Sequence, residues 1–288
     1  MADSLETSDT WSRLRRHTPA RIGLARVGAS LATREHLAFQ LAHARARDAV
    51  HVRLDPTPLL HGLAARGLDP LSLHSAATDR QTYLLRPDLG RRLDAPSRQR
   101  LDACPRGHDL NLVLADGLSP GAVQSHALPL IDAVLPELRR HEWAIGPVAV
   151  VEQGRVAIGD EIGAALAGAL VAVLIGERPG LSAPESLGVY VTWEPKIGRV
   201  DAERNCLSNI RPEGLGYRAA AALERRDAER RRAFALALAG PASAARDALL
   251  KASGPCLRSH SFVARRPLSF FQGLDVRLGA LLLGSATS

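Results

Sequence analysis

The residues with the clearest potential for binding chemistry are Glu177 and Arg178. They belong to the stretch GERPGL (176–181), which directly follows a strongly apolar run (170–175). The glycines of this stretch permit close backbone approach, and its proline restricts the loop. A carboxylate and a guanidinium on a rigid loop suit a large polar ligand with amide and hydroxyl edges. The alternative is a solvated ion pair, which contributes less than about 1 kcal/mol to stability.

A second candidate is the stretch Gly117-Leu118-Ser119-Pro120-Gly121, which matches the G-x-S-x-G pattern of a hydrolase nucleophile. The oxyanion hole of such an enzyme needs the backbone N–H of the residue after the serine, and Pro120 has none. Ser119 as a helix N-cap and Pro120 as the first helical residue explain both positions. An α/β serine hydrolase that uses Ser119 is therefore the weaker interpretation.

Other cofactor and metal patterns are missing from the sequence. No G-x-G-x-x-G or phosphate-binding G-x-x-x-x-G-K motif follows an apolar run. Cys104 and His108 have no third ligand nearby, so we predict no metal site and no catalytic residue. The three cysteines form no C-x-x-C pair, which favours a reducing cytoplasm.

Composition indicates a globular protein that neither crosses a membrane nor is secreted. The chain has 288 residues and 46% hydrophobic residues, enough for a large core. No apolar run approaches the roughly 20 residues of a membrane helix, and the amino-terminal stretch lacks the apolar centre of a secretion signal. The net charge of +7 leaves a nucleic-acid-binding protein as an alternative. Against it, the arginines are dispersed among acidic residues.

The elements that must position these residues alternate between strands and helices. We predict strands over 109–117, 147–156, 170–175 and 187–193, and helices over 119–138 and 160–169. This order indicates an α/β fold with an open, mainly parallel, Rossmann-like or flavodoxin-like sheet and helices on both faces. Such sheets bind ligands beyond the carboxyl ends of their strands. We therefore expect 116–117, 152–156, 176–180 and the loop 194–214 at one edge.

The amino-terminal part is predicted to be helical. A long helix is expected over 33–51, with Thr33 as its cap and Glu35 in its first turn, followed by short helices and turns over 59–104. The predicted organisation is a disordered segment (1–12), a helical region (13–104), an α/β domain (105–217) and a tail (218–288).

Several stretches together resemble the small subunit of ethanolamine ammonia-lyase. They include DRQTYLLRPDLG (79–90), IGERPGLSAPESLGVYVTW (175–193) and DAERNCLSNIRPEGLGY (201–217). The matching stretches run in family order over about residues 13 to 217. GERPGL and ERNCLSNI are the most specific of them.

The resemblance implies an adenosylcobalamin-dependent lyase that converts ethanolamine to acetaldehyde and ammonia by a radical mechanism. In this family the small subunit closes over the cobalamin against a TIM-barrel large subunit, and is expected to be inactive alone. The family's cobalamin contacts match Val156, Glu177 and Cys206 here. The helix 33–51, with Arg45 and Arg47, is expected to dock the large subunit; a solvated charged face is the alternative. The enzyme is expected in the cytoplasm, free or inside a bacterial microcompartment.

The resemblance is expected to end near Ala222, where the sequence becomes rich in Ala and Arg. Two explanations fit this composition: a shifted reading frame, or a lineage-specific helical extension. If the tail is not a native sequence, the last helix of the α/β domain is missing and apolar sheet surface is exposed.

Overall fold

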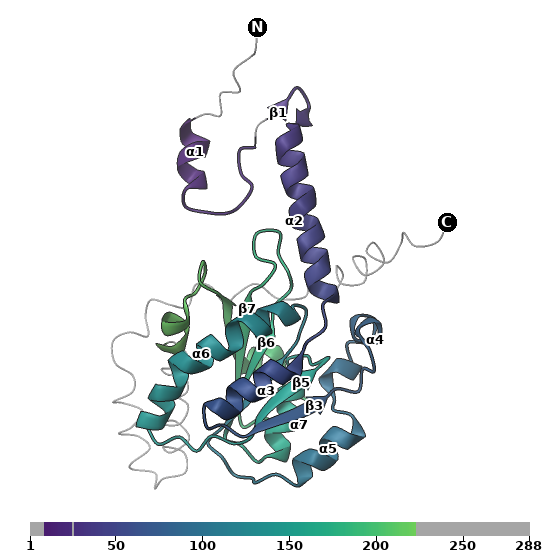
Figure 1. The fold of residues 1–288 in the computed structure, drawn as a ribbon, viewed down its shortest axis with the longest axis vertical. Helices are drawn as coiled ribbons and strands as arrows, with labels where there is room; N and C mark the ends of the chain where they lie inside the picture. The colour runs from purple at the N-terminus through teal and green to yellow at the C-terminus, as the bar shows by residue number, and fades with distance from the viewer. Residues whose placement is uncertain (1–8, 25, 223–288) are drawn as a thin grey trace.

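A computed structural model describes residues 9–24 and 26–222, and in them a six-stranded sheet forms the body of the protein (Figure 1). The strand order is β3-β5-β4-β6-β7-β8, in which β3, β5, β4 and β6 are mutually parallel and β7 is antiparallel to both of its neighbours. The strands are β3 (Pro70–His74), β4 (Leu110–Ala115), β5 (Val148–Glu152), β6 (Leu170–Gly176), β7 (Leu187–Trp193) and β8 (Arg204–Ile210). The predicted open, mainly parallel α/β sheet is confirmed.

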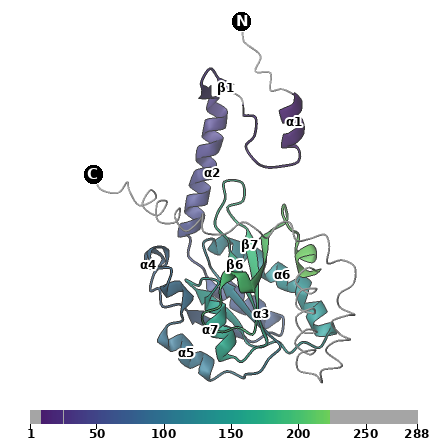
Figure 2. The same cartoon turned by 180° about the vertical axis from the view of Figure 1, so that it is seen from behind.

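The central strands are buried on both faces, so their side chains divide into two cores. Alternate residues of β4, Leu110, Leu112 and Leu114, pack with α3 (Pro56–Ala65) and α6 (Pro120–Arg140) on one face. Val113 and Ala115 face the other way, toward α5 (Ala95–Asp102) and α7 (Ile158–Ala165). Figures 1 and 2 show these helix pairs on opposite sides of the sheet. Successive side chains point to opposite faces, and both faces are buried, so the sequence of these strands is almost continuously apolar.

Aspartates begin three of the shorter helices. The side chains of Asp55, Asp79 and Asp94 accept hydrogen bonds from backbone N–H groups in the first turns of α3, α4 (Arg80–Leu85) and α5. These bonds satisfy N–H groups that have no partner inside the helix. A short 3₁₀ turn, η1 (Leu89–Arg91), connects α4 to the segment before α5, and a second, η2 (Asp201–Glu203), leads into β8.

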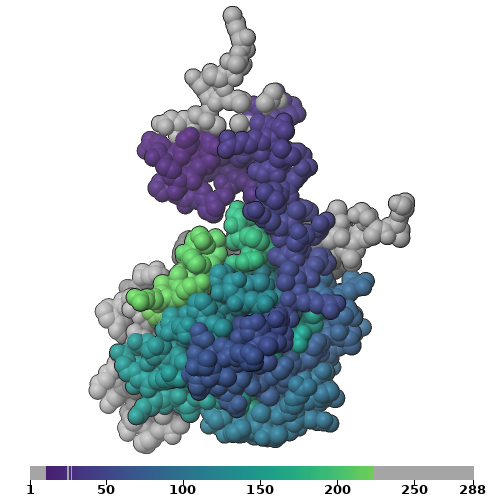
Figure 3. Space-filling model, viewed as in Figure 1, coloured from purple at the N-terminus to yellow at the C-terminus, as the bar shows by residue number. Residues whose placement is uncertain are grey.

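The amino-terminal part projects from the body. Helix α2 (Thr33–His51) rises above the sheet, and the short helix α1 (Asp9–Arg15) and the hairpin β1 (Arg26–Val27)–β2 (Ser30–Leu31) lie at its far end (Figures 1 and 3). The bounds of α2 confirm the prediction. The predicted cap is wrong, because the N-cap residue is Ala32, which has no capping side chain.

Three further details differ from the sequence prediction. Residues 9–12 begin α1 rather than being disordered, and the ring of Trp11 lies against Gly23. Strand β3 lies inside the region predicted to consist of helices and turns, so the sheet begins well before residue 105. Strand β8 was predicted as part of a loop.

The direction of β7 corrects the predicted location of one loop. Because β7 is antiparallel to β6, Trp193 pairs with Leu170 at the amino end of β6. Glu194 therefore lies at the edge opposite Glu177. Strand β8 then returns the chain, and Ile210 pairs with Leu187 at the carboxyl edge. Only the end of the predicted 194–214 loop reaches the expected edge.

No helix among residues 9–24 and 26–222 has the length and apolar character needed to cross a membrane. The prediction of a shifted frame or extension concerns residues 218–288, of which all beyond Ala222 lie outside the described part of the chain.

Candidate functional site

A depression open to solvent lies where the connections of the sheet diverge. Strands β4 and β5 are neighbours, and the chain leaves them toward opposite faces, through α6 and α7. Such a switch point creates a crevice beyond the carboxyl ends of the strands. The depression spans about 880 Å³, a volume that includes the open solvent at its mouth. It is lined by Tyr83, Gly117, Leu118, Arg155, Val156, Ile175, Gly176, Glu177, Arg178, Tyr190 and Ser208.

Glu177 is half-buried at the rim of this depression, and three donors hold its carboxylate. Ser186 Oγ donates to Oε2 at 2.7 Å, and Ser208 Oγ donates to Oε1 at 2.5 Å. The backbone N–H of Asn209 donates to Oε2 at 3.0 Å. Because a carboxylate offers about four acceptor sites, this arrangement leaves capacity for about one further hydrogen bond.

Val156 and Cys206 stand at different distances from the depression. Val156 lines it directly and is half-buried. Cys206 lies on β8, where it pairs with Tyr190 of β7, and Tyr190 lines the depression. Burial raises the pKa of the Tyr190 phenol, as do the neighbouring Cys206 and Glu177. The fold thus brings two of the three predicted residues into one lining and places the third beside it.

The floor of the depression contains a cation–aromatic stack. The buried ring of Tyr83 lies between two guanidinium groups, with Arg80 4.6 Å and Arg155 4.5 Å from its centroid. Arg155 Nη2 also donates to the Tyr83 carbonyl at 3.0 Å. Arg155 Nε is buried without a hydrogen-bond partner among the described residues.

Behind the lining, Asp116 is almost fully buried at the end of β4. Its carboxylate accepts hydrogen bonds from the backbone N–H groups of Gln153 at 2.9 Å and Gly154 at 2.8 Å. Arg80 Nη1 lies 3.5 Å from Asp116 Oδ2. Burial nevertheless raises the pKa of Asp116 to about 6, because removal from water outweighs these contacts. Burial also lowers the pKa of the Arg80 guanidinium.

No sequence motif marks Arg80, Tyr83 or Arg155 as functional residues. Arg80 and Tyr83 lie in the stretch DRQTYLL, whose helical pattern gives no sign of its long-range contacts. Their only available signal was that this stretch is one of those that resemble the family.

Ser119 is not arranged as a nucleophile. It is fully buried, and its hydroxyl donates to the carbonyl of Pro184 at 3.0 Å. It occupies the N-cap position of α6, as predicted, but without a side-chain capping bond, and Pro120 follows as the first helical residue. A serine hydrolase that uses Ser119 is therefore not supported.

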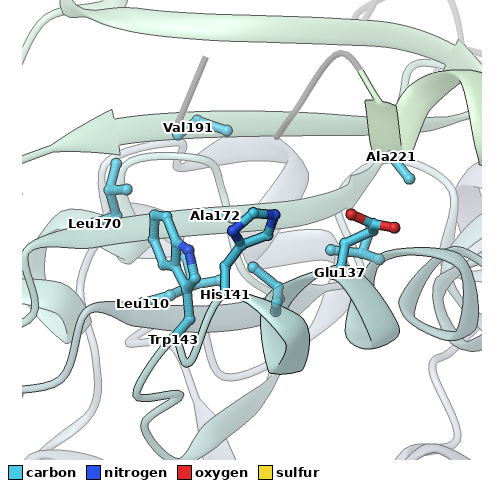
Figure 4. Close-up of a pocket in the computed structure, with 10 residues that line it drawn as sticks. Leu110, Glu137, His141, Trp143, Leu170, Ala172, Val191 and Ala221 are labelled. Carbon is cyan, nitrogen blue, oxygen red and sulfur yellow. The ribbon is translucent and has the colours of Figure 1, made fainter. Parts of the chain in front are cut away.

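A second hollow lies on the α6 face near the amino ends of β4 and β6 (Figure 4). Apolar side chains such as Leu110, Leu170 and Val191 dominate it, with Glu137 and His141 from the end of α6. Ala221, next to the last described residue, also contributes to the lining. It lacks the converging polar groups of the carboxyl-edge depression, which remains the candidate site.

The sheet defines an α/β protein with a mainly parallel sheet and a polar crevice beyond the carboxyl ends of its parallel strands, the place where sheets of this kind commonly bind ligands. Comparison with known proteins identifies the family. A model of the family described as ethanolamine ammonia-lyase light chain (EutC) matches residues 8–250. The chain belongs to the ethanolamine ammonia-lyase small-subunit (light-chain) family.

Curated relatives named ethanolamine ammonia-lyase small subunit agree with this. The protein from Ralstonia nicotianae is 58% identical over 219 residues, which are 75% of this chain and 81% of the relative. The protein from Azotobacter vinelandii is 57% identical over the same shares of both chains. The protein from Pseudomonas fluorescens is 55% identical over 73% of this chain and 78% of the relative. These names describe subunits of a lyase.

The family match also corrects the predicted end of the resemblance. It extends to residue 250, well beyond Ala222. Because Ala and Arg are both common in helices, an Ala/Arg-rich composition does not by itself mark the end of a family match.

Proposed function

We propose that this chain is the small subunit of an adenosylcobalamin-dependent ethanolamine ammonia-lyase and closes over the cobalamin against the large subunit. The observation that carries the proposal is the carboxyl-edge depression. Its lining combines apolar side chains (Leu118, Val156 and Ile175) with the carboxylate of Glu177 and the guanidinium of Arg155.

The donor set of this depression fits a cobalamin. The corrin ring presents broad, largely apolar faces, its edge carries amide groups, and its nucleotide loop carries a phosphate. Apolar residues at the centre suit the ring, and charged groups make the strongest hydrogen bonds to its polar edge. Arg155, which lines the depression, offers its guanidinium to the phosphate of such a ligand.

The three predicted contact residues then have different roles. Val156 offers an apolar contact, and Glu177 offers its remaining acceptor site to an amide or hydroxyl of the cofactor. Cys206 lies beside Tyr190, where it supports the wall of the depression. When bound, the cofactor supplies the radical that removes a hydrogen atom from ethanolamine. The residues of this chain bind and orient the cofactor and exclude water.

The projecting amino-terminal part is the proposed docking surface for the large subunit. Its apolar side chains are unusually exposed for their size: Leu37 is 57% and Leu41 is 53% exposed on α2, and Trp11 is 45% exposed on α1. Exposed apolar groups that gather in one region mark interaction sites. Arg45 and Arg47 lie on the same helix and are exposed, which suits the polar rim of an interface.

The amino-terminal part is also tied to the loop that contains Glu177 and Arg178. Ser182 Oγ donates to the carbonyl of Pro19 at 3.3 Å, and Arg21 Nη2 donates to the carbonyl of Leu181 at 3.5 Å. Figure 1 shows α2 on the side of the body from which the loop between β6 and β7 projects. Because Glu177 and Arg178 of this loop line the crevice, the proposed docking surface lies on the same side as the crevice. A large subunit bound to α2 would face the open depression.

Co-expression with the large subunit tests this proposal. The purified complex is titrated with cyanocobalamin and followed by visible absorbance, and with adenosylcobalamin and ethanolamine for acetaldehyde release. We expect a complex of both chains that binds cobalamin and forms acetaldehyde. A stable complex that binds no cobalamin would contradict the proposal. Arg66→Gln is a suitable control, since Arg66 pairs with Asp132 outside the depression.

A further inference from the structure

One buried guanidinium joins the docking helix to the floor of the crevice. Arg80 Nε donates to the carbonyl of Val50 in the last turn of α2 at 2.7 Å. Its Nη1 donates to the carbonyl of Gly117 at 2.9 Å and to Gln153 Oε1 at 3.3 Å. Nη1 also lies 3.5 Å from Asp116 Oδ2. Three segments far apart in the sequence therefore meet at Arg80.

The partner atoms show why these contacts fix positions rather than merely add stability. Val50 lies in the last four residues of α2, whose carbonyls have no partner within the helix, so Arg80 caps this helix end. Gly117 lies in the turn after β4 and has a φ of +57°. Gln153 lies in the turn after β5 and has a φ of +56°. Glycine adopts this conformation readily, whereas the positive φ of Gln153 is uncommon for an L-residue and needs support from the surrounding structure.

The chemistry of arginine suits this position better than that of lysine. Arg80 is 8% exposed and donates from Nε on one side and from Nη1 on the other. A guanidinium is planar and presents donors in fixed directions, whereas an ammonium is a compact group on a flexible stem. Arg80 also stacks on Tyr83, which lines the depression.

We propose that Arg80 is a positioning residue that couples docking of the large subunit to the shape of the cobalamin crevice. Arg80 does not line the depression itself; it acts through Gly117 and Tyr83, which do. A partner that holds α2 in place also holds the carbonyl of Val50 and, through it, the side chain of Arg80. Arg80 in turn holds the two turns that contain Gly117 and Gln153. This inference rests on the proposed function. It adds that Arg80 strengthens the coupling between cobalamin binding and subunit association beyond what the direct contacts of the cofactor supply.

The coupling is measured as a ratio of affinities. The dissociation constant of the large subunit for this chain is determined with and without saturating cyanocobalamin, by biolayer interferometry. Coupling between two binding sites usually changes affinity by about 5- to 150-fold. We expect a ratio in that range for the wild type. For Arg80→Lys, which keeps the direct contacts of the cofactor with both chains, we expect the ratio to fall by at least about fivefold. Thermal unfolding of each free chain reports the structural cost separately.

Arg204→Lys provides a matched control. Arg204 is also a buried arginine paired with an aspartate, Asp160, but it lies at the opposite edge of the sheet beside Thr192. We expect this variant to lose stability and keep the wild-type coupling ratio. A coupling ratio lost equally in both variants would show a merely structural role for Arg80 and overturn the inference.

A second variant keeps the experiment decisive if Arg80→Lys does not fold. Gln153→Asn retains the guanidinium and shortens one of its partners, and asparagine tolerates positive φ. We expect it to reduce the coupling ratio about two- to fivefold. An unchanged ratio in whichever variant folds would overturn the inference. A wild-type complex that binds no cobalamin would instead contradict the proposed function.

Discussion

Ser208 Oγ donates a hydrogen bond to Glu177 Oε1 at 2.5 Å and so ties the end of β8 to the residue after β6. Between these strands lies β7, and Ser186, just before β7, donates to the other oxygen of the same carboxylate. Glu177 thus holds three adjacent chain segments at the rim of the crevice. Its carboxylate is a structural anchor as well as the proposed contact for cobalamin.

This double role predicts two separable effects of substitution at Glu177. Glu177→Ala removes the acceptor for three donors, and we expect it to lower the free energy of unfolding by about 1–3 kcal/mol. We also expect it to weaken cobalamin binding to the complex by at least about tenfold. Urea unfolding and an absorbance titration measure the two quantities. Ser186→Ala is the control, since it removes one donor and leaves the charge of Glu177 in place. We expect it to lower the free energy of unfolding by about 1 kcal/mol and to leave cobalamin affinity unchanged.

A second prediction concerns Ser119. Its buried hydroxyl bonds the Pro184 carbonyl, so Ser119→Ala should lower the free energy of unfolding by about 0.5–1.5 kcal/mol. The wild-type chain should not react with a fluorophosphonate probe for activated serines, as judged by intact-mass spectrometry. Labelling that disappears in Ser119→Ala would revive the hydrolase interpretation.

The pKa of Asp116 predicts a pH dependence of stability with a definite sign. Burial raises this pKa from 3.8 to about 6 in the folded chain. The folded state therefore holds the proton more tightly than the unfolded state between these values. The resulting contribution favours folding at pH below about 4 and is lost as the pH rises through about 6.

The measurement is the unfolding free energy of the wild type minus that of Asp116→Asn, taken from about pH 3 to about pH 8 so that both plateaus are covered. We expect this difference to fall with increasing pH and to level off above about pH 7. A difference that rises with pH would show that Arg80 and the two backbone N–H donors outweigh burial.

The exposed apolar residues of α2 give a fourth prediction. Leu37→Ser combined with Leu41→Ser should weaken association with the large subunit by at least about tenfold, because apolar interface anchors are lost. The free energy of unfolding of the free chain should change by about 0.5 kcal/mol or less, since both side chains are largely exposed. If the double variant binds the large subunit as tightly as the wild type does, the docking surface lies elsewhere. Arg47→Ser is the matched control on the charged face of the same helix. If the apolar side chains supply most of the binding energy, this variant weakens association with the large subunit less than the double leucine variant does.

The buried pair Arg204–Asp160 gives a fifth prediction. Two hydrogen bonds of 2.5 and 2.6 Å join these side chains, and both are 2% exposed. Asp160→Asn should lower the free energy of unfolding by about 3–5 kcal/mol, because it removes the buried counterion of Arg204 and leaves only the exposed Asp201, 3.7 Å from Nε. Chemical unfolding of the free chain measures this loss. The exposed pair Arg86–Asp88 is the comparison, and Asp88→Asn should cost less than about 1 kcal/mol.

A strand could be predicted from the sequence where burial of its faces constrains the residue types. The sequence predicts β4 and β6 as strands because both of their faces are buried, which favours apolar residues at every position; Asn111 of β4 is the one exception. The prediction missed β3, which is short and begins with proline, and β8, whose exposed polar residues resemble a loop. Both are edge strands of the sheet, where burial constrains the sequence least.

The sequence by itself determined the apolar strands, the long helix α2 and the presence of Glu177 after a buried strand, because these depend on local patterns of burial. Only the tertiary structure decided that β7 runs antiparallel, that Ser186 and Ser208 hold Glu177, and that Arg80 joins α2 to the crevice. Strand direction and buried polar contacts depend on pairings between residues far apart in the chain. No periodicity within one segment records them.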